Sequence, residues 1–337
     1  MYSVVMICLC AVLCGMRSYA AIGHWAARAP QDVLRALESR VVASAFGVRA
    51  APSGATIRRV IIGLDAGGLA GLGAIGLETV TMLSLDGKRA KGSGDRHTMA
   101  NLVAAMTPDR RVVAQVRIDG DGDEIAAVQQ LITGLNIKNR VITADALHTQ
   151  NDTAAAISAA KGFYLLAVKG NRKSLYRQFK NLPWAQIPIA SKTVETGHGR
   201  DETRTITVAT MTKLPFPSAT QVIAVRRWRR NRRTRKTSWE LTFYITNIPP
   251  HLYNADDLAS FIRSHWGIEI LHHIRDTTFD EDRSQIRAGA GPQNMASLRN
   301  ITIGLLSMMG INTIAKTLRD NHLLAYTQPL QILGLTQ

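Results

Sequence analysis

Hydrophobic and polar positions divide the chain into a helical start, a strand-rich middle and a helical end. Residues 1 to about 76 carry apolar positions at helical spacing. They include the run Val33 to Ala45 and a short helix over Thr56 to Ile61 that Ser53 can cap. Four later segments share the helical spacing: 258–274, 294–309, 312–320 and 329–335. The pattern therefore predicts helices at both ends of the chain.

The middle of the chain predicts a regular α/β domain. Strands are expected at 79–86, 99–106, 111–118, 140–146 and 162–169, and helices at 124–135 and 151–161. The resulting order is β-β-β-α-β-α-β, an antiparallel meander followed by two crossovers, which is the order of the ribonuclease H-like fold. The sequence therefore predicts an α/β protein. It has a ribonuclease H-like catalytic core with a β-rich insertion at about 170–250, flanked by helical N- and C-terminal segments.

Two aspartates follow apolar strand runs at the places where this fold carries acidic residues. Asp86 follows Leu83-Ser84-Leu85, and Asp145 follows the run from Val141 to Ala144. A single aspartate at a strand end is usually a turn-former, but these two strands lie side by side in this topology. Glu269, in a late helix, adds a third carboxylate. Carboxylate oxygens suit Mg²⁺ or Mn²⁺, and two such ions can support in-line displacement at phosphorus.

The charge balance predicts a polyanionic partner. The 337 residues contain 41 Lys and Arg against 25 Asp and Glu, a formal net charge of +16. Nucleic acid is the first partner class that this excess favours, and an anionic membrane surface is the second. Eight of the eleven residues from Arg226 to Lys236 are cationic and none is acidic, so this run equals half of the net charge.

We interpret the basic run as a phosphate-binding loop, with a solvated hairpin tip as the alternative. If all eight cations met phosphates, the log–log salt slope of binding would be about −7. The predicted DNA-binding residues are Lys88, Lys169, Arg226, Arg227, Arg229, Arg230, Arg232, Arg233, Arg235 and Lys236.

Three weaker patterns receive structural interpretations. All three cysteines lie in the apolar run Tyr2 to Met16. We expect small buried hydrophobes of a core helix in a reducing compartment, rather than a signal peptide or a zinc site. The segment Gly71 to Gly76 matches G-x-G-x-x-G, but the strand expected at 79 leaves no room for the crossover helix of a dinucleotide site. Three histidines flank Glu269: His265, His272 and His273. We expect them either to assist the reaction near the scissile phosphate or to pack in the core, and zinc ligation is less favoured. We expect Trp266 to be a core residue or to pack against the helix that carries Glu269.

Several motifs resemble one family, the bacterial insertion-sequence DDE transposases of the H-repeat-associated protein type. The resemblance covers nearly the whole chain. The matching segments are Leu85 to Lys88, Thr143 to Gln150, Val168 to Asn171, Gly197 to Arg200 with His198, His265 to Glu269, Glu281-Asp282, and Leu298-Arg299-Asn300.

The resemblance implies a domain plan and a site. Residues 1–76 would be the helical N-terminal transposase-associated domain, and 77–337 the DDE catalytic domain. Asp86, Asp145 and Glu269 would be the catalytic, metal-binding triad. The activity implied is cleavage dependent on Mg²⁺ or Mn²⁺, with two ions expected, at the inverted-repeat ends of the element, followed by strand transfer into target DNA.

The resemblance also implies partners and leaves two alternatives open. Double-stranded DNA is the expected partner, with a homodimer on DNA, no membrane, and a cytoplasmic, nucleoid-associated location. The chain departs from the family pattern by a later start and by one residue fewer after Glu269, where it reads Ile270-Leu271-His272-His273. The alternatives are therefore a decayed, inactive transposase that only binds DNA, and a ribonuclease H-like nuclease acting outside transposition.

Overall fold

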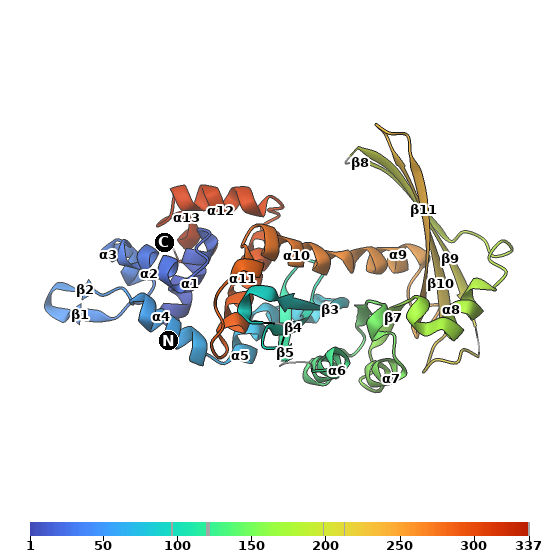
Figure 1. The fold of residues 1–337 in the computed structure, drawn as a ribbon, viewed down its shortest axis with the longest axis horizontal. Coiled ribbons are helices and arrows are strands. Elements are labelled where there is room, and N and C mark those ends of the chain that lie inside the picture. The colour runs from blue at the N-terminus through green and yellow to red at the C-terminus, as the bar shows by residue number, and fades with distance from the viewer. Residues whose placement is uncertain (96, 119–121, 198, 212, 336–337) are drawn as a thin grey trace. The chain divides into compact units, whose positions relative to one another are not determined.

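The computed structural model describes residues 1–95, 97–118, 122–197, 199–211 and 213–335 (Figure 1). The chain forms two compact units. The first contains Met1–Leu77, Gly87–Glu124 and Ile268–Gln337, and the second contains Glu78–Asp86 and Ile125–Gly267. Strand β3 (Met82–Ala90) contributes its first five residues to the second unit and its last four to the first.

Helices from both ends of the chain build the core of the first unit. They are α1 (Tyr2–Leu13), α2 (Tyr19–Ala27), α3 (Gln31–Ala36), α4 (Gly54–Gly63), α5 (Ala66–Gly71), α11 (Gly291–Met308), α12 (Ile314–Leu323) and α13 (Gln328–Ile332). Helix α1 packs against α11. Its residues from Ile7 to Leu13 are at most 5% exposed, which confirms the predicted buried core helix.

The three cysteines are buried hydrophobes of this core. Cys8, Cys10 and Cys14 are free and buried. Burial raises the pKa of each thiol to about 12, so the thiols stay protonated and behave as small apolar groups. This confirms their predicted role.

One predicted helix is too long. The run Val33 to Ala45 is helical only to Ala36, where α3 ends, and Glu38 then adopts a left-handed φ of 53°. An antiparallel hairpin follows, β1 (Val41–Ala43) and β2 (Val48–Arg49). Apolar spacing cannot separate these cases over so short a run, and the β-branched valines favour extended backbone. The predicted cap at Ser53 is confirmed, since its Oγ accepts from the Thr56 amide at 3.2 Å.

The glycine-rich segment before β3 packs closely against a neighbouring strand. Residues 72–79 form two 3-10 turns and no crossover helix. A Cβ on Gly73 would lie 1.9 Å from the Val112 carbonyl oxygen, so glycine is required for this close approach to β5 (Val112–Ile118). In the same unit β5 pairs antiparallel with β4 (Ala100–Met106), which lies beside β3.

A seven-stranded sheet forms the second unit. Its order is β3-β6-β7-β11-β10-β9-β8. β3, β6 and β7 are parallel, and the other strands are antiparallel. The bounds are β6 (Val141–Ala144), β7 (Phe163–Val168), β8 (Ser191–Gly197), β9 (Arg200–Thr210), β10 (Gln221–Asn231) and β11 (Thr237–Thr246). Together with β4, β5 and the helices, these strands confirm the prediction of an α/β chain.

Helices α6 (Glu124–Gly134) and α7 (Asn151–Ala159) lie between the strands at the predicted places. The helix predicted at 258–274 is two helices, α9 (Ala255–Ser264) and α10 (Trp266–Thr277), and α8 (Lys173–Lys180) was not predicted. The order β3-β4-β5-α6-β6-α7-β7 is therefore the order that the sequence predicted. The β-rich section at about 170–250 also contains one helix, α8. Across the described residues, the helices lack the combination of length and apolar character that crossing a membrane requires.

Candidate active site

Asp86 and Asp145 lie at equivalent positions on neighbouring parallel strands. Leu85 of β3 pairs with Ala144 of β6, and the next residue along each strand is the aspartate. The preceding residues of both strands are buried. These buried runs hold the strands in the sheet, and the first charged residue after each run lies at the carboxyl-terminal edge. Asp86 is half-buried and Asp145 is exposed. The structure therefore brings together the two aspartates that the strand pattern singled out.

Asp145 is held by the turn that it begins. Its Oδ1 accepts a hydrogen bond from the Leu147 amide at 2.9 Å and caps the 3-10 turn Ala146–His148. Nε2 of the fully buried His148 lies 3.9 Å from the same oxygen. No contact of the second oxygen, Oδ2, is recorded among the described residues. One oxygen of Asp145 is thus fixed by the backbone, and the other is open to a ligand.

His265 is anchored to the same strand end. Its Nδ1 lies 3.1 Å from the Thr143 hydroxyl, which lies 3.2 Å from the Ser84 hydroxyl on β3. Burial lowers the pKa of His265 to about 4, while Asp145 acts in the opposite direction and His148 and Lys169 add to the lowering. His265 is therefore neutral at neutral pH. The sequence pattern gave no role to Thr143 or Ser84, since buried hydroxyls in an apolar strand carry no distinctive spacing.

The third parallel strand brings a cation to this edge. Lys169 is exposed and directly follows β7. Asn171, two residues later, donates to the Ala146 carbonyl at 2.5 Å, which ties this loop to the turn at Asp145. Because Lys169 directly follows β7, which lies beside β6 in the parallel part of the sheet, its positive charge lies at the same edge as the aspartates.

Glu269 lies on α10, in the first unit. Its side chain is exposed in the first turn of the helix. It comes four residues, about one helical turn, after His265. Helix α10 runs without interruption through the segment after Glu269.

The donor chemistry of the two aspartates fits a hard divalent cation. Two carboxylates at neighbouring strand ends repel each other unless a cation neutralises them. Within the described ranges, no group of three or more His, Cys, Asp or Glu side chains is arranged to hold one ion. The strand register places two carboxylates at one edge of the sheet.

The basic run is divided between a strand and a turn. β10 continues to Asn231 and pairs with β11, so only the residues after Asn231 form the hairpin tip. Arg227 is 7% exposed, donates to Glu202 at 2.8 Å, and lies 4.7 Å over the ring of Trp266. Arg229 contacts Glu202 at 3.4 Å from the same face. Two predicted DNA-binding arginines are therefore already paired within the protein.

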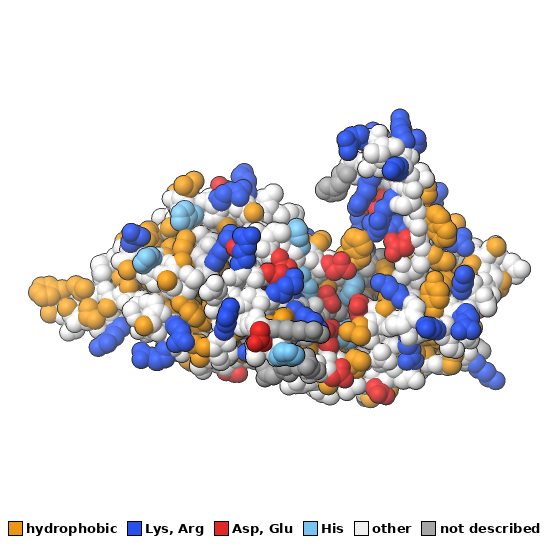
Figure 2. Space-filling model, viewed as in Figure 1, with side chains coloured by type: hydrophobic (Ala, Val, Ile, Leu, Met, Phe, Trp, Pro, Cys, Tyr) orange, Lys and Arg blue, Asp and Glu red, His pale blue; other side chains and the backbone are white. Residues whose placement is uncertain are grey.

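The rest of the basic run is available to an external partner. Arg226, Arg233, Arg235 and Lys236 are exposed and Arg230 is half-buried. No carboxylate within ion-pair distance of these five is recorded in the part of the chain that the structure describes. Arg232 lies 3.9 Å from Asp201. Figure 2 shows Lys and Arg side chains gathered over the free end of this hairpin.

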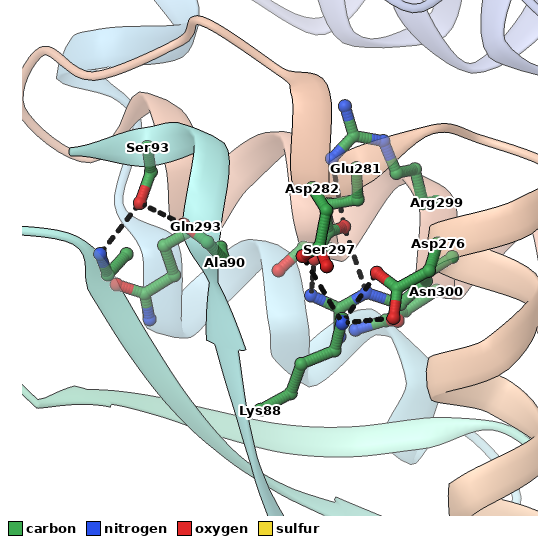
Figure 3. A network of polar contacts seen from close by, with 12 residues as sticks. Lys88, Ala90, Ser93, Asp276, Glu281, Asp282, Gln293, Ser297, Arg299 and Asn300 are labelled. Atoms are coloured by element: carbon green, nitrogen blue, oxygen red, sulfur yellow. Dashed lines mark hydrogen bonds and ion pairs between the residues drawn. The ribbon is translucent and has the colours of Figure 1, made fainter. Parts of the chain in front are cut away.

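Lys88 lies in an ion-pair network in the first unit. Its side chain is 7% exposed, and its Nζ donates to both carboxylate oxygens of Asp276 at 2.6 and 2.7 Å (Figure 3). Asp282 lies 3.9 Å away. This predicted DNA-binding residue is therefore largely neutralised by carboxylates. His198 of the predicted motif lies outside the described residues.

Comparison with known proteins gives two adjacent family matches. The family model described as "Transposase DDE domain" matches residues 76–305. The model described as "DDE_Tnp_1-associated" matches residues 1–72.

Individual relatives have low sequence identity to this chain, but the matched segments are long. "Putative transposase YncI" of Escherichia coli O157:H7 is 29% identical over 246 residues, 67% of this chain and 61% of that protein. "H repeat-associated putative transposase YhhI" of Escherichia coli K12 is 28% identical over 244 residues, 67% of this chain and 64% of that protein. The chain thus spans less than two thirds of the length of these relatives.

A third relative and a solved structure also match this chain. "Uncharacterized protein in dhlA 3'region" of Xanthobacter autotrophicus is 32% identical over 216 residues, 60% of this chain and 70% of that protein. A solved piggyBac transposase synaptic complex with hairpin DNA aligns with a TM-score of 0.41 and 11% identity, over 74% of this chain and 53% of that one. A likeness at this score supports no argument.

Proposed function

This chain belongs to the DDE-domain transposase family, and from that premise we propose that it is the transposase of a bacterial insertion sequence. It would cleave phosphodiester bonds at the inverted-repeat ends of its element and transfer the strands into target DNA. The observation that carries the proposal is the pairing of Leu85 with Ala144, which sets Asp86 and Asp145 side by side at one sheet edge. In a chain of this family, two such carboxylates are the core of a metal-dependent phosphoryl-transfer site.

The fold proposed for the catalytic core is ribonuclease H-like. The element order β3-β4-β5-α6-β6-α7-β7 supports it, as do the neighbour orders β5-β4-β3 and β3-β6-β7. We further propose that residues 1–76 form the N-terminal associated domain and 77–337 the catalytic domain with its basic β-rich insertion.

Asp86, Asp145 and Glu269 are the proposed ligands for two Mg²⁺ or Mn²⁺ ions. Glu269 is included because it lies within the segment that the family model matches and ends the motif His265 to Glu269. When bound, such ions would supply positive charge at the scissile phosphate and favour deprotonation of the attacking hydroxyl.

The other residues of the proposed site would hold its backbone segments in place and bind the DNA. Thr143 and His265 fix the end of α9 to β6, and the neutral imidazole adds no charge that would repel a cation. Asn171 fixes the turn that carries Asp145. Lys169 would attract a DNA phosphate to the sheet edge, and the exposed cations of the hairpin tip would hold the flanking duplex. A homodimer on DNA and a cytoplasmic, nucleoid-associated location belong to the same proposal.

The test is cleavage of a duplex that carries the element's own ends. Purified protein is incubated with this duplex and with a scrambled duplex, with Mg²⁺, with Mn²⁺ or with chelator. We expect nicking at the ends that requires metal and is abolished by Asp145→Ala. The matched control is Asp152→Ala, an exposed aspartate in the first turn of α7, which should retain cleavage.

Two other outcomes would reject the proposal. Binding to the ends without nicking would indicate an inactive protein that only binds DNA. Equal cleavage of the scrambled duplex would indicate a nuclease that acts outside transposition.

A further inference from the structure

A cavity in the first unit has the composition of an anion site. It has a volume of about 420 Å³ and is lined by the beginning of α2 and by the segment from Phe279 to Ile286, with Arg299 of α11. Three arginines and one aspartate line it: Arg17, Arg283, Arg299 and Asp280. The lining therefore has two positive charges in excess. None of its residues is among the proposed DNA-binding or catalytic residues.

Arg299 brings unused donors to the cavity. Its side chain is 2% exposed, and its Nη1 donates to Glu281 at 2.9 Å. Its Nε and Nη2 are buried without a hydrogen-bond partner among the described residues. Figure 3 shows Arg299 with one nitrogen directed at Glu281 and another directed away from the side chains drawn. Because a buried guanidinium N–H without a partner is costly, these two donors point to a missing acceptor.

The start of α2 adds donors of a second kind. The Tyr19 hydroxyl is buried and also lacks a partner in the described part of the chain. Burial raises the pKa of Tyr19 to about 12, so the hydroxyl remains a donor at neutral pH. Ser18 caps the nine-residue α2 through the Ala21 amide. The amides of Tyr19 and Ala20 come before it and have no acceptor within the helix. A helix N-terminus favours an anion.

The rim carries two more cations. Arg17 donates to the Thr278 carbonyl at 2.8 Å and lies 3.5 Å from Asp280. Arg283 is 85% exposed and lies 3.8 Å from Asp280. Asp280 offsets one of these charges, and the other remains available to attract an anion from solvent.

We propose that this cavity binds a phosphate group, which accepts hydrogen bonds from Arg299, Tyr19 and the first amides of α2. A phosphate fits better than a planar carboxylate because its tetrahedral oxygens can meet donors from several directions, while the Arg299 fork supplies two parallel bonds. The phosphate comes either from the DNA backbone or from free inorganic phosphate. The DNA source rests on the proposed function, and the cavity itself does not.

The first experiment titrates inorganic phosphate into the full chain at constant ionic strength, by calorimetry and by thermal unfolding. We expect saturable binding and a rise in Tm. Tyr19→Phe removes only an unpartnered hydroxyl, so the fold should persist while phosphate affinity falls about tenfold. The matched control, Tyr2→Phe, changes an exposed tyrosine on α1 outside the cavity lining and should bind as the wild type does.

A second variant tests the rim of the cavity independently of Tyr19. Arg283→Gln should weaken phosphate binding at the rim, and Arg35→Gln, an exposed cation on α3 outside the cavity lining, should not. The proposal is overturned if the wild type shows no saturable binding up to about 10 mM phosphate. It is equally overturned if both Tyr19→Phe and Arg283→Gln bind as the wild type does.

The second experiment separates the two sources. If DNA supplies the phosphate, Tyr19→Phe weakens binding of a duplex, and saturating phosphate weakens duplex binding by the wild type more than by the variant. If phosphate binds while the duplex is unaffected by Tyr19→Phe, the cavity is a site for free phosphate and the proposal stands. If the protein shows metal-dependent cleavage but no phosphate binding, the proposed phosphate site is rejected and the proposed function is retained.

Discussion

Arg275 donates two hydrogen bonds to Glu281 inside the first unit, from Nε to Oε2 at 2.9 Å and from Nη2 to Oε1. The two side chains are 1% and 2% exposed. Arg299 contacts the same carboxylate from α11. Burial alone would raise the pKa of Glu281, but the two arginines lower it to about 2. This carboxylate is therefore charged at neutral pH and joins α10, the 3-10 turn at Glu281 and α11.

Removing this charge should destabilise the fold strongly. Glu281→Gln would leave two buried guanidinium groups without a counter-charge, so we expect a loss of about 3–5 kcal/mol in the free energy of unfolding. Urea unfolding of the wild type and the variant measures this loss. Asp280→Asn is the matched control, because Asp280 is 35% exposed and its ion pairs are 3.5 and 3.8 Å long; it should cost at most about 1 kcal/mol. Equal losses in the two variants would contradict a structural role for the buried network.

His265 should make the protein sensitive to mild acid. Burial lowers the pKa of His265 from 6.5 to about 4. As the pH falls below 6.5, the unfolded chain binds the proton first, so stability decreases between about pH 6.5 and 4 and levels off below. The pKa difference corresponds to roughly 3 kcal/mol. Unfolding free energies measured over this range should decline more steeply for the wild type than for His265→Gln. His251→Gln, at an exposed histidine, should keep the wild-type slope, and identical slopes in all three proteins would rule this mechanism out.

Local sequence predicted the strand ends well, because the information lies within each strand. Asp86 and Asp145 each follow a largely apolar run, and the order of strands then makes them neighbours. The register between Leu85 and Ala144 then sets the two aspartates side by side. The assignment of Glu269 remains a prediction.

Long-range pairing was not visible in the sequence. Charge counting treated Arg226 to Lys236 as one basic loop. Strand alternation turns Arg227 and Arg229 toward Glu202, a residue 25 positions away from Arg227. Lys88 was likewise grouped with the basic residues, although Asp276 lies 188 positions later in the chain and binds it. Such partners depend on register and on the packing of distant elements, neither of which a local pattern contains.

The hairpin tip should control the salt dependence of DNA binding. Replacing Arg233, Arg235 and Lys236 with glutamine removes three exposed cations, so the log–log salt slope should become shallower by up to about 2.7. The matched control replaces Lys173, Arg177 and Lys180 of α8, which are exposed cations of the same unit. Binding of a duplex at several salt concentrations gives the slopes. If both triple variants change the slope equally, the tip is a solvated turn with no particular role in binding.

Asp145→Asn should separate metal binding from folding. Asparagine can replace aspartate as the cap that accepts from the Leu147 amide, so metal-free stability should change by less than about 1 kcal/mol. Mg²⁺ or Mn²⁺ should raise the Tm of the wild type by mass action and should raise that of the variant much less. Thermal unfolding with and without metal measures both effects, with Asp152→Asn as control. A metal-induced Tm rise of the same size in Asp145→Asn would show that the ion binds elsewhere.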